Sequence, residues 1–281
     1  MQVFNTIESL NDYLEGCRNR TQSVALVPTM GGLHEGHLRL INKAKECADV
    51  VVASIFVNPT QFASGEDFEH YPQSQEKDIE NLEKRQVDAL FMPEIGDIYP
   101  QGQKSEYDFG ELAQMLCGIS RPTHFNGVVQ VVARFFDIFK PDVAVFGEKD
   151  YQQLAIIKEL VKRKYSDIKI VSVPIIRESD GLAMSTRNNY LSVKDRARAP
   201  LFYQALRAAH EELQSGNDIA LTAKKTLAVL SESFVVDYVE ILDANTLKEI
   251  TPKSKEIIII SAVRLGATRL IDNIVFRRAN V

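Results

Sequence analysis

A chain of 281 residues, of which 45% are hydrophobic and 25% charged, can bury one large core or two modest ones. Its net charge of −5 argues against a dedicated polynucleotide-binding surface but allows small anionic ligands. No segment reaches the roughly 18 to 20 uninterrupted apolar residues of a membrane span, and the N-terminus lacks the layout of a signal peptide. We therefore expect a cytoplasmic protein with neither a membrane nor a nucleic acid as partner. Cys17, Cys47 and Cys117 are widely spaced and are interpreted as reduced thiols rather than a disulfide framework or a zinc site.

Apolar segments alternate with amphipathic, charged ones through the first 175 residues, a pattern typical of a parallel sheet built from βα units. The strands are expected at Ser23–Pro28, Val50–Val57, Ala89–Met92, Val143–Phe146 and Ile170–Val173. Helices are expected at Gly36–Cys47, Ser74–Arg85 and Val128–Phe139. Because these strands are continuously apolar, we expect helices on both faces of a Rossmann-like α/β sheet.

The pattern changes after Pro174, where a polar turn precedes two helices and then two strands. The helices are expected at about Lys194–Gln214 and at Ile219–Glu232, and the strands at Val236–Leu242 and Ile257–Val263. This order predicts two domains, a Rossmann-like one over residues 1–175 and a smaller α+β one over residues 176–281.

Ligands of an open parallel sheet bind beyond the carboxyl ends of its strands, so the segment Pro28–His37, PTMGGLHEGH, is a candidate site. Its glycines let the backbone approach a nucleotide, and the next helix offers unpaired N–H groups to phosphates. His34 and His37 are three residues apart and can converge on one anionic group if they share a helix face. Taken alone, the pair fits surface or capping histidines better, and zinc is disfavoured because no third ligand is evident.

Three further polar segments follow expected strands or the domain boundary. The side-chain amides of Asn58 and Gln61 can bind a ligand that carries a hydroxyl and a carboxylate. They are equally compatible with an ordinary turn. Lys149 comes directly after a strand, where its flexible ammonium group can stay close to a phosphate as the charge moves. Most lysines are simply exposed to solvent, and this alternative stays open for Lys149. Gln153 lies one turn into the next helix. Residues 185–187, Ser-Thr-Arg, form either a phosphate clamp or a simple interdomain loop.

The arrangement His-x-Gly-His after a first strand resembles the HIGH signature of the nucleotidyltransferase superfamily. The chain as a whole resembles the pantothenate synthetase family, through PTMGGLHEGH, SIFVNPTQF, EDFEHYP, RPTHFNGVVQVV, VFGEKDYQQL, RESDGLAMSTRNNYL, DYVEILD and GATRLIDN. The resemblance implies a ligase that forms an amide bond between pantoate and β-alanine through a pantoyl-adenylate, releasing AMP and pyrophosphate. It also implies ATP as a substrate, Mg²⁺ on the triphosphate and a homodimer.

The resemblance assigns a role to each matching residue. His37 would donate a proton, His34 would contact the phosphates beside it, and Lys149 and Arg187 would supply positive charge. The ATP-binding residues that it implies are Met30, Gly31, Gly32, Leu33, His34, Glu35, Gly36, His37, Gly147, Glu148, Lys149, Asp150, Ile176, Met184, Ser185, Thr186 and Arg187. The residues implied for pantoate and β-alanine are Gln61 and Gln153, with Asn58 and Tyr71 near the same pocket.

Some features depart from the family pattern or stay open. Thr186 replaces a serine and keeps the hydroxyl, whereas Gln73 replaces a common arginine and removes a positive charge. No metal ligands are identified; Asp78 is at best an indirect contributor to a magnesium site. The apolar segment Glu256–Val263 fits a subunit interface and an internal strand equally well.

Two other functions are compatible with the nucleotide site. Another adenylyl- or cytidylyltransferase of the superfamily would leave the nucleotide on its product and would need no amine. A non-catalytic nucleotide-binding regulator would bind ATP without releasing pyrophosphate.

Overall fold

The computed structural model describes residues 1–63, 65–102 and 107–278. The chain divides into two compact units. The first contains Met1–Glu148 and Ile156–Pro174, and the second contains Lys149–Ala155 and the chain from Ile175 onward. Within the described ranges, no helix combines the length and the apolar character that crossing a bilayer requires.

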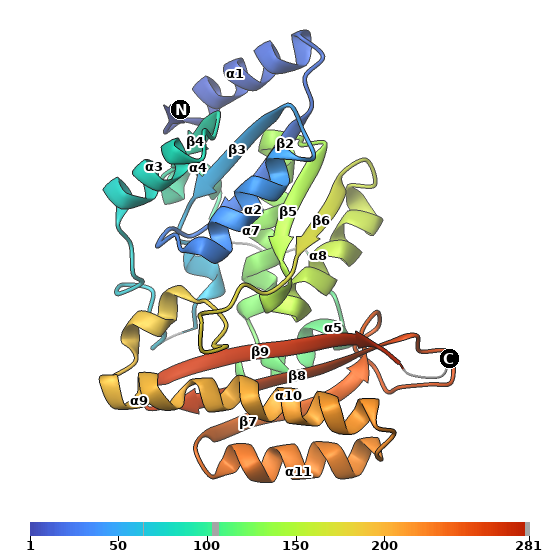
Figure 1. The fold of residues 1–281 in the computed structure, drawn as a ribbon. Coiled ribbons are helices and arrows are strands. Elements are labelled where there is room, and N and C mark those ends of the chain that lie inside the picture. The colour runs from blue at the N-terminus through green and yellow to red at the C-terminus, as the bar shows by residue number, and fades with distance from the viewer. Residues whose placement is uncertain (64, 103–106, 279–281) are drawn as a thin grey trace. The chain divides into compact units, whose positions relative to one another are not determined.

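The first unit is built on a six-stranded parallel sheet with the order β1-β4-β3-β2-β5-β6 (Figure 1). Its strands are β1 (Gln2–Phe4), β2 (Val24–Thr29), β3 (Val50–Ile55), β4 (Ala89–Phe91), β5 (Val143–Gly147) and β6 (Lys169–Val173). Five of them lie where the apolar segments predict strands. The edge strand β1 was not expected, because three residues, two of them exposed, are too short to show a periodicity.

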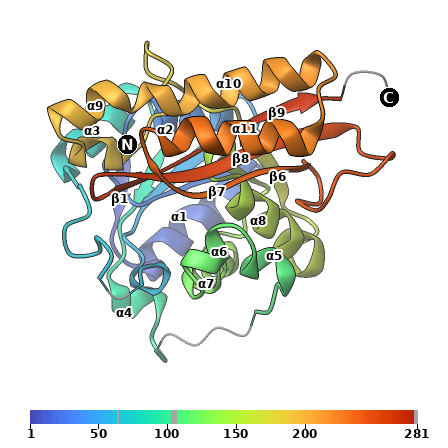
Figure 2. The same ribbon diagram turned by 90° about the horizontal axis from the view of Figure 1, so that it is seen from below.

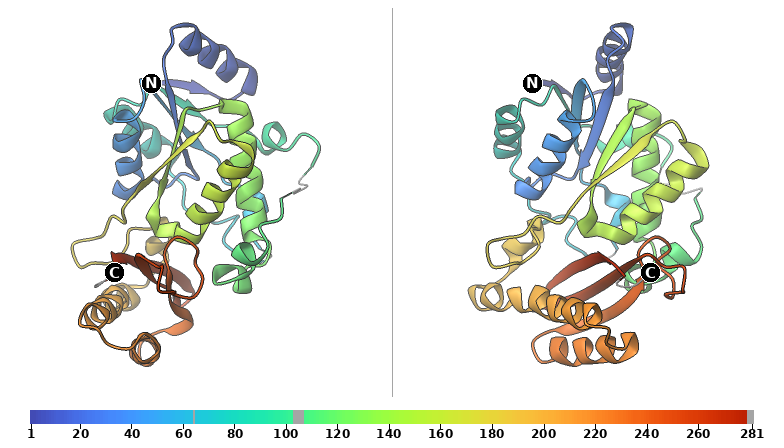
Figure 3. Two further views of the ribbon diagram at one scale, coloured as in Figure 1. Left: turned by 90° about the vertical axis from the view of Figure 1, so that its right-hand side faces the viewer. Right: turned by 45° about the vertical axis from the view of Figure 1, so that its right-hand side comes forward.

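Helices cover both faces of this sheet, as the fold prediction requires. One face carries α2 (Glu35–Lys45) and α3 (Gln75–Lys84), and the other carries α1 (Ile7–Asn19), α7 (His124–Phe139) and α8 (Tyr151–Lys164) (Figures 2 and 3). Three one-turn helices, α4 (Ile95–Ile98), α5 (Glu111–Gln114) and α6 (Cys117–Ser120), lie between β4 and α7. The chain leaves β2 toward β3 but later adds β5 on the other side of β2. The carboxyl ends of β2 and β5 therefore flank the topological switch point, where such sheets bind ligands.

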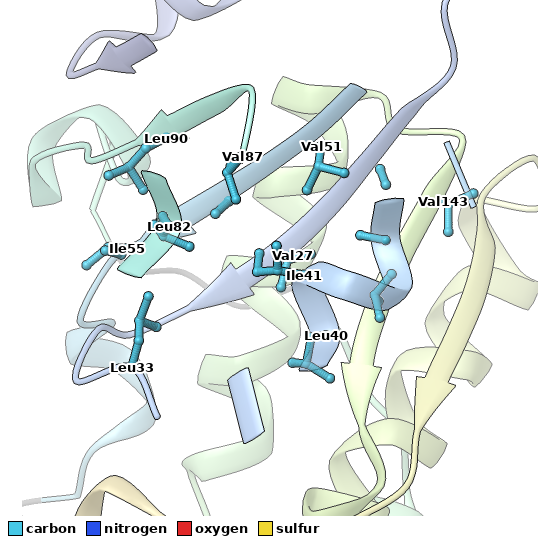
Figure 4. Packing of buried hydrophobic residues seen from close by; sticks show 14 of the residues in the cluster. Val27, Leu33, Leu40, Ile41, Val51, Ile55, Leu82, Val87, Leu90 and Val143 are labelled. Atoms are coloured by element: carbon cyan, nitrogen blue, oxygen red, sulfur yellow. The ribbon is translucent and has the colours of Figure 1, made fainter. Parts of the chain in front are cut away.

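The core on the α2 and α3 side of the sheet also fixes the loop after β2. Val27, Val51 and Leu90 of the strands pack against Ile41 of α2 and Leu82 of α3 (Figure 4). Leu33, which lies in the loop and not in a regular element, belongs to the same cluster and is only 7% exposed. Burial of a leucine contributes about 1.5–3 kcal/mol, so Leu33 ties the loop to the core.

The second unit contains an antiparallel sheet with the order β7-β8-β9, formed by β7 (Val235–Asp243), β8 (Glu256–Leu265) and β9 (Thr268–Arg277). The helices α10 (Pro200–Gln214) and α11 (Ile219–Ser231) lie side by side on one face of it (Figure 2). The apolar segment Glu256–Val263 is its central strand, paired along both edges, so the internal-strand alternative describes it.

In this unit one sequence expectation was wrong and one strand was missed. The single helix expected at Lys194–Gln214 is two helices, α9 (Val193–Arg198) and α10, because Pro200 lacks the N–H that a continuous helix needs. The strand β9 was not expected, because Asp272 and Asn273 interrupt its apolar pattern although both are buried.

Candidate active site

The glycine loop, which we define as Met30–His34 between β2 and α2, has a conformation that depends on glycine. Gly31 and Gly32 have φ values of 83° and 63°, a region that other residues rarely adopt. A Cβ atom on Gly31 would lie 3.2 Å from Asp78 Oδ2 and 3.2 Å from Ile55 Cγ2. The loop is therefore folded closely onto β3 and α3.

Asp78 anchors this loop from α3. Its Oδ2 accepts a hydrogen bond from Gly32 N at 2.7 Å, and its Oδ1 accepts one from Leu33 N at 2.7 Å. The residue is only 2% exposed, so a buried carboxylate is compensated by two backbone dipoles. Sequence reasoning considered Asp78 only as an indirect contributor to a metal site and missed this role. In the described part of the chain, no group of three or more His, Cys, Asp or Glu side chains is arranged to hold a metal ion.

The two histidines lie side by side at the start of α2. His34 is the N-cap residue, and its Nδ1 accepts from Gly36 N at 3.1 Å. His37 Nδ1 accepts from His34 N at 3.3 Å, and the two ring centroids are 4.1 Å apart. Because both Nδ1 atoms act as acceptors, each neutral ring bears its proton on Nε2. The pair thus has two Nε2–H donors on adjacent rings.

The expectation that this helix N-terminus offers unpaired N–H groups to phosphates was wrong for most of the loop. Side chains of the protein accept from the N–H groups of Gly31, Gly32, Leu33, His34 and Gly36. A phosphate on this segment would consequently meet the imidazoles rather than a row of backbone donors.

The amide loop, which we define as Asn58–Gln61 after β3, is held by Asn58. Its Nδ2 donates to Gly127 O at 3.0 Å and to Gln61 Oε1 at 3.1 Å. Its Oδ1 accepts from Tyr99 Oη at 2.6 Å and from Thr60 Oγ1 at 2.9 Å. Asn58 is 1% exposed and uses both amide hydrogens within the protein, so the ordinary-turn alternative describes this residue.

Gln61 connects the amide loop to the glycine loop, since its Nε2 lies 3.0 Å from Met30 Sδ. Helix α7 packs so tightly against this segment that a Cβ on Gly127 would lie 2.2 Å from Thr60 O. Tyr71 is 9% exposed and makes an edge contact with Phe62, just after the loop. Met30, Gln61 and the aromatic pair therefore come from neighbouring segments of one unit.

A salt bridge that sequence reasoning did not single out holds the chain after Gln61. The guanidinium of Arg121 binds both carboxylate oxygens of Glu66 at 2.6 Å, and its Nη2 lies 3.3 Å from Gln61 O. His124 Nδ1 lies 2.9 Å from the same carbonyl. Burial would raise the pKa of Glu66, but the hydrogen bonds and charge of Arg121 outweigh it and hold this pKa below its usual value. The motif RPTHFNG supplies both partners of the Gln61 carbonyl.

At the end of β5, Gly147 borders the switch point of the sheet. A Cβ there would lie 3.9 Å from Leu40 Cδ2 of α2, so this strand end lies close to the helix that follows the glycine loop. Glu148 accepts from Ser172 Oγ at 2.7 Å. Gly147 therefore lies beside α2, and Glu148 is bonded to β6.

Other residues of the implied site belong to the second unit. Lys149 and Asp150 lie in the 3₁₀ turn η2 (Glu148–Asp150), and their charged groups are 3.8 Å apart. Asn273 Nδ2 donates to Lys149 O at 3.1 Å, which ties this turn to β9. Gln153 lies in the first turn of α8, and this turn, up to Ala155, also belongs to the second unit, whereas α8 from Ile156 onward belongs to the first.

The phosphate loop, which we define as Ile176–Arg187, folds back on itself. Met184 N donates to Ile176 O at 2.9 Å, and Gly181 turns the chain with a φ of 95°. Ser185 then caps the 3₁₀ turn η3 (Thr186–Tyr190) by accepting from Arg187 N at 3.3 Å. The implied nucleotide residues Ile176 and Met184 are thus neighbours across the loop, and the three residues 185–187 begin a defined turn.

Comparisons with known proteins identify the family of this chain. The family model described as pantoate-beta-alanine ligase matches residues 2–275. The chain belongs to the pantoate–β-alanine ligase family. A relative in this family, pantothenate synthetase of Vesicomyosocius okutanii subsp. Calyptogena okutanii (strain HA), is 49% identical over 275 residues, covering 98% of this chain and 96% of the relative. Pantothenate synthetase of Syntrophomonas wolfei is 46% identical over 279 residues, covering 98% and 99%.

Solved structures of the family have the same fold. Pantothenate synthetase from Thermus thermophilus superposes with a TM-score of 0.92 at 39% identity, covering 98% of this chain and 99% of that one. The ligase from Francisella tularensis, described as complexed with beta-gamma ATP and β-alanine, gives a TM-score of 0.80 at 36% identity, covering 98% and 97%.

Proposed function

We propose that the protein condenses pantoate with β-alanine to pantothenate at the expense of ATP. The observation that carries this proposal is the match to the family over residues 2–275, which includes every candidate site residue. The Francisella relative, described as complexed with beta-gamma ATP and β-alanine, supports ATP and β-alanine as substrates. A different nucleotidyltransferase or a non-catalytic regulator is not favoured, because neither accounts for a match along the whole chain.

The proposed reaction has two steps. The carboxylate of pantoate attacks the α-phosphorus of ATP and releases pyrophosphate, and the amine of β-alanine then attacks the acyl-adenylate and releases AMP. Neither step requires a covalent enzyme nucleophile. Catalysis would depend on holding the reactants in line and on donors aimed at the developing phosphate charge.

The proposed phosphate donors come from both units. In the first unit, the Nε2–H groups of His34 and His37 are adjacent, and a hydrogen bond from His37 to the leaving pyrophosphate would stabilise its charge; the role of His37 as a proton donor, implied by the resemblance, stays part of the proposal. In the second unit, Lys149 and Arg187 supply positive charge. The remaining ATP-binding residues inferred from the sequence stay part of the proposal.

For the acid being activated, we assign Gln61 and Gln153 as the pantoate-binding amides, with Tyr71 near the same pocket. Neutral amides can hold a hydroxyl and a carboxylate without adding a charge to a dry site. Asn58 is assigned a supporting role, since its hydrogen bonds hold Gln61 in place.

Mg²⁺ is proposed to accompany ATP. The described residues offer no cluster of carboxylates for it, and both oxygens of Asp78 accept backbone N–H groups. The ion is proposed to be held mainly by phosphate oxygens and water, as is usual for nucleotide-bound magnesium. When bound, it would neutralise part of the triphosphate charge.

The assembly and location inferred from the sequence are also proposals. A homodimer predicts twice the mass of a 31.6 kDa chain in light scattering of the purified protein, and a mass equal to one chain would contradict it. The cytoplasmic location stays a prediction.

The decisive experiment measures AMP and pyrophosphate formation by the purified protein. We expect pyrophosphate release to depend on pantoate, and multiple turnovers of AMP to depend on both pantoate and β-alanine. Pyrophosphate release without any amine-dependent AMP would indicate a different nucleotidyltransferase. ATP binding without pyrophosphate release would indicate a regulator.

A further inference from the structure

Two segments without an assigned role, residues 177–181 (RESDG) and residues 266–273 (GATRLIDN), meet inside the second unit. Arg177, from the first motif, forms a bidentate ion pair with Asp272, from the second, with Nη1–Oδ2 at 2.6 Å and Nη2–Oδ1 at 2.9 Å. The side chains are 18% and 2% exposed, so the pair is largely removed from water. A bidentate arginine–carboxylate pair fixes both distance and orientation.

The guanidinium of Arg177 also fixes main-chain groups of both motifs. Its Nη1 donates to Gly181 O at 3.1 Å, at the turn of the phosphate loop, and its Nη2 donates to Asn273 O at 3.3 Å. The carbon Cζ lies 3.6 Å from the ring centroid of Tyr203, which covers the guanidinium from α10. A Cβ on Gly181 would lie 2.5 Å from Tyr203 Cδ1, so the turn is packed directly against the same ring.

The strand side of the pair leads to Lys149. Asp272 Oδ1 accepts from Asn273 N at 2.7 Å, and Asn273 Nδ2 donates to Lys149 O at 3.1 Å. Asn273 is 3% exposed. A continuous chain of hydrogen bonds therefore runs from the turn of the phosphate loop through Arg177, Asp272 and Asn273 to the main chain of Lys149.

This pair is poorly explained as a source of stability. Burial raises the pKa of the Asp272 carboxyl, and the hydrogen bonds and charge of Arg177 offset only part of that rise. A buried ion pair of this kind often contributes no more to stability than apolar residues of similar volume would. The fixed distance and orientation that a bidentate pair imposes explain the presence of this pair better than stability does.

We propose that Arg177, Asp272 and Asn273 are positioning residues that hold Lys149 and the phosphate loop in fixed relation, so that both present their side chains to the ATP phosphates. The proposal rests on the proposed function. It assigns no contact with substrate to the three residues, which act through Lys149 and Ser185–Arg187.

The test compares Asp272→Asn and Arg177→Lys with the wild type in pyrophosphate release and in calorimetric ATP binding. Each variant removes the bidentate pair with little change of volume. We expect KM and Kd for ATP to rise on the order of tenfold to a hundredfold, since a misplacement of about 1 Å can cost a hundredfold. KM for pantoate should change less than about threefold, because the hydrogen bonds of the three residues lead to Gly181 and Lys149, which are not assigned to pantoate.

A matched control lies in the same sheet. Arg269, also on β9, pairs with Asp237 at 2.7 Å, and both side chains are 15% exposed. Asp237→Asn should leave KM and Kd for ATP at the wild-type values. An equal rise in this control would overturn the proposal, because it would show general loosening of the unit. Unchanged ATP binding in folded Asp272→Asn would overturn it as well.

A second variant covers the case in which the single variants fold poorly. Arg177→Met combined with Asp272→Leu replaces the pair by apolar side chains, so neither partner is left as an unpaired buried charge. We expect a folded protein whose Kd for ATP remains raised; wild-type affinity would overturn the proposal.

The binding measurement separates this proposal from the proposed function. If the wild type binds ATP without releasing pyrophosphate, the proposed function fails, and the affinities of the variants still test the positioning role. If the wild type binds no ATP, the proposed function and the positioning role are both overturned.

Discussion

The glycine loop of the first unit and the phosphate loop of the second are each anchored by a buried carboxylate, but the two carboxylates are compensated differently. Asp78 accepts two backbone N–H groups, whereas Asp272 binds the guanidinium of Arg177 in addition to one backbone N–H group. In the first unit the anchor binds the N–H groups of the loop itself. In the second, Arg177 binds carbonyl oxygens, those of Gly181 and Asn273.

The difference has a consequence for anion binding. Because the anchor and the capping histidines occupy the N–H groups of the glycine loop, the imidazoles are the groups that this loop can direct at a phosphate. In the second unit, donors from Arg177 and Asn273 occupy carbonyl oxygens whose partial negative charge would repel a phosphate. The glycine loop is thus held in place through its own N–H donors, and the phosphate loop through hydrogen bonds that satisfy its carbonyl acceptors.

The largest effect is expected from removing the proposed phosphate donor of either unit. His37→Ala in the first unit and Lys149→Ala in the second should each slow pyrophosphate release by roughly a hundredfold or more, the scale for one pre-placed donor. Single-turnover measurements with saturating ATP and pantoate isolate this step. Lys84→Ala, at an exposed pair on α3, serves as the control and should keep the wild-type rate. A near wild-type rate in either site variant would remove that residue from the proposed mechanism.

A smaller effect is expected from the first anchor. Asp78→Asn keeps the size of the side chain but places an NH₂ group where one carboxylate oxygen accepted a backbone N–H. A buried donor left without a partner costs about 1–3 kcal/mol, so kcat/KM for ATP should fall about tenfold or more. Hydrogen exchange of the Gly32 and Leu33 amides should accelerate in the same variant.

The control for this experiment is a carboxylate that also accepts a backbone N–H group, at the opposite end of the sheet. Asp142 Oδ2 accepts from Val24 N at 2.7 Å, where β2 begins. Asp142→Asn should leave kcat/KM for ATP unchanged. Unchanged exchange of the loop amides in Asp78→Asn would show that the carboxylate does not hold the loop.

The sequence predicts which residues lie at the strand ends better than it predicts the buried carboxylates that anchor the loops. Pro28–His37, Asn58, Gln61 and Lys149 follow strands whose apolar composition is plain, so their location at the carboxyl edge follows from the fold class. Asp78 lies in the charged segment QEKDIENLEK, where nothing distinguishes a buried acid from solvated ones.

The second anchor, Asp272, could not be recognised in the sequence for a related reason. Asp272 and Asn273 interrupt the apolar pattern of β9, so the strand itself was missed. The same interruption was the available signal, because a buried acid in an otherwise apolar strand needs a partner such as Arg177. Pairings between residues 95 positions apart cannot be derived from periodicity.

The smallest effect is expected at Glu66, where a partly exposed ion pair with Arg121 supports the amide loop. The pKa of Glu66 is lowered in the folded protein, so its charge stabilises the fold above the usual value of 4.5 and this contribution is lost as pH falls through the lowered pKa. Glu66→Gln should therefore lower the urea midpoint slightly at pH 7, and the difference from wild type should close below pH 4.5.

Urea titrations between about pH 3 and pH 7 measure this difference. Glu46→Gln, at the exposed pair with Lys43, is the matched control, and its shift should be smaller because solvent screens that pair more strongly. KM for pantoate should rise about two- to fivefold in Glu66→Gln, the range for a partly exposed ion pair. A midpoint difference that persists at about pH 3 would show that the shape of the side chain, and not its charge, supports Gln61. The amide loop would then differ from the glycine loop and the phosphate loop in having no charged anchor.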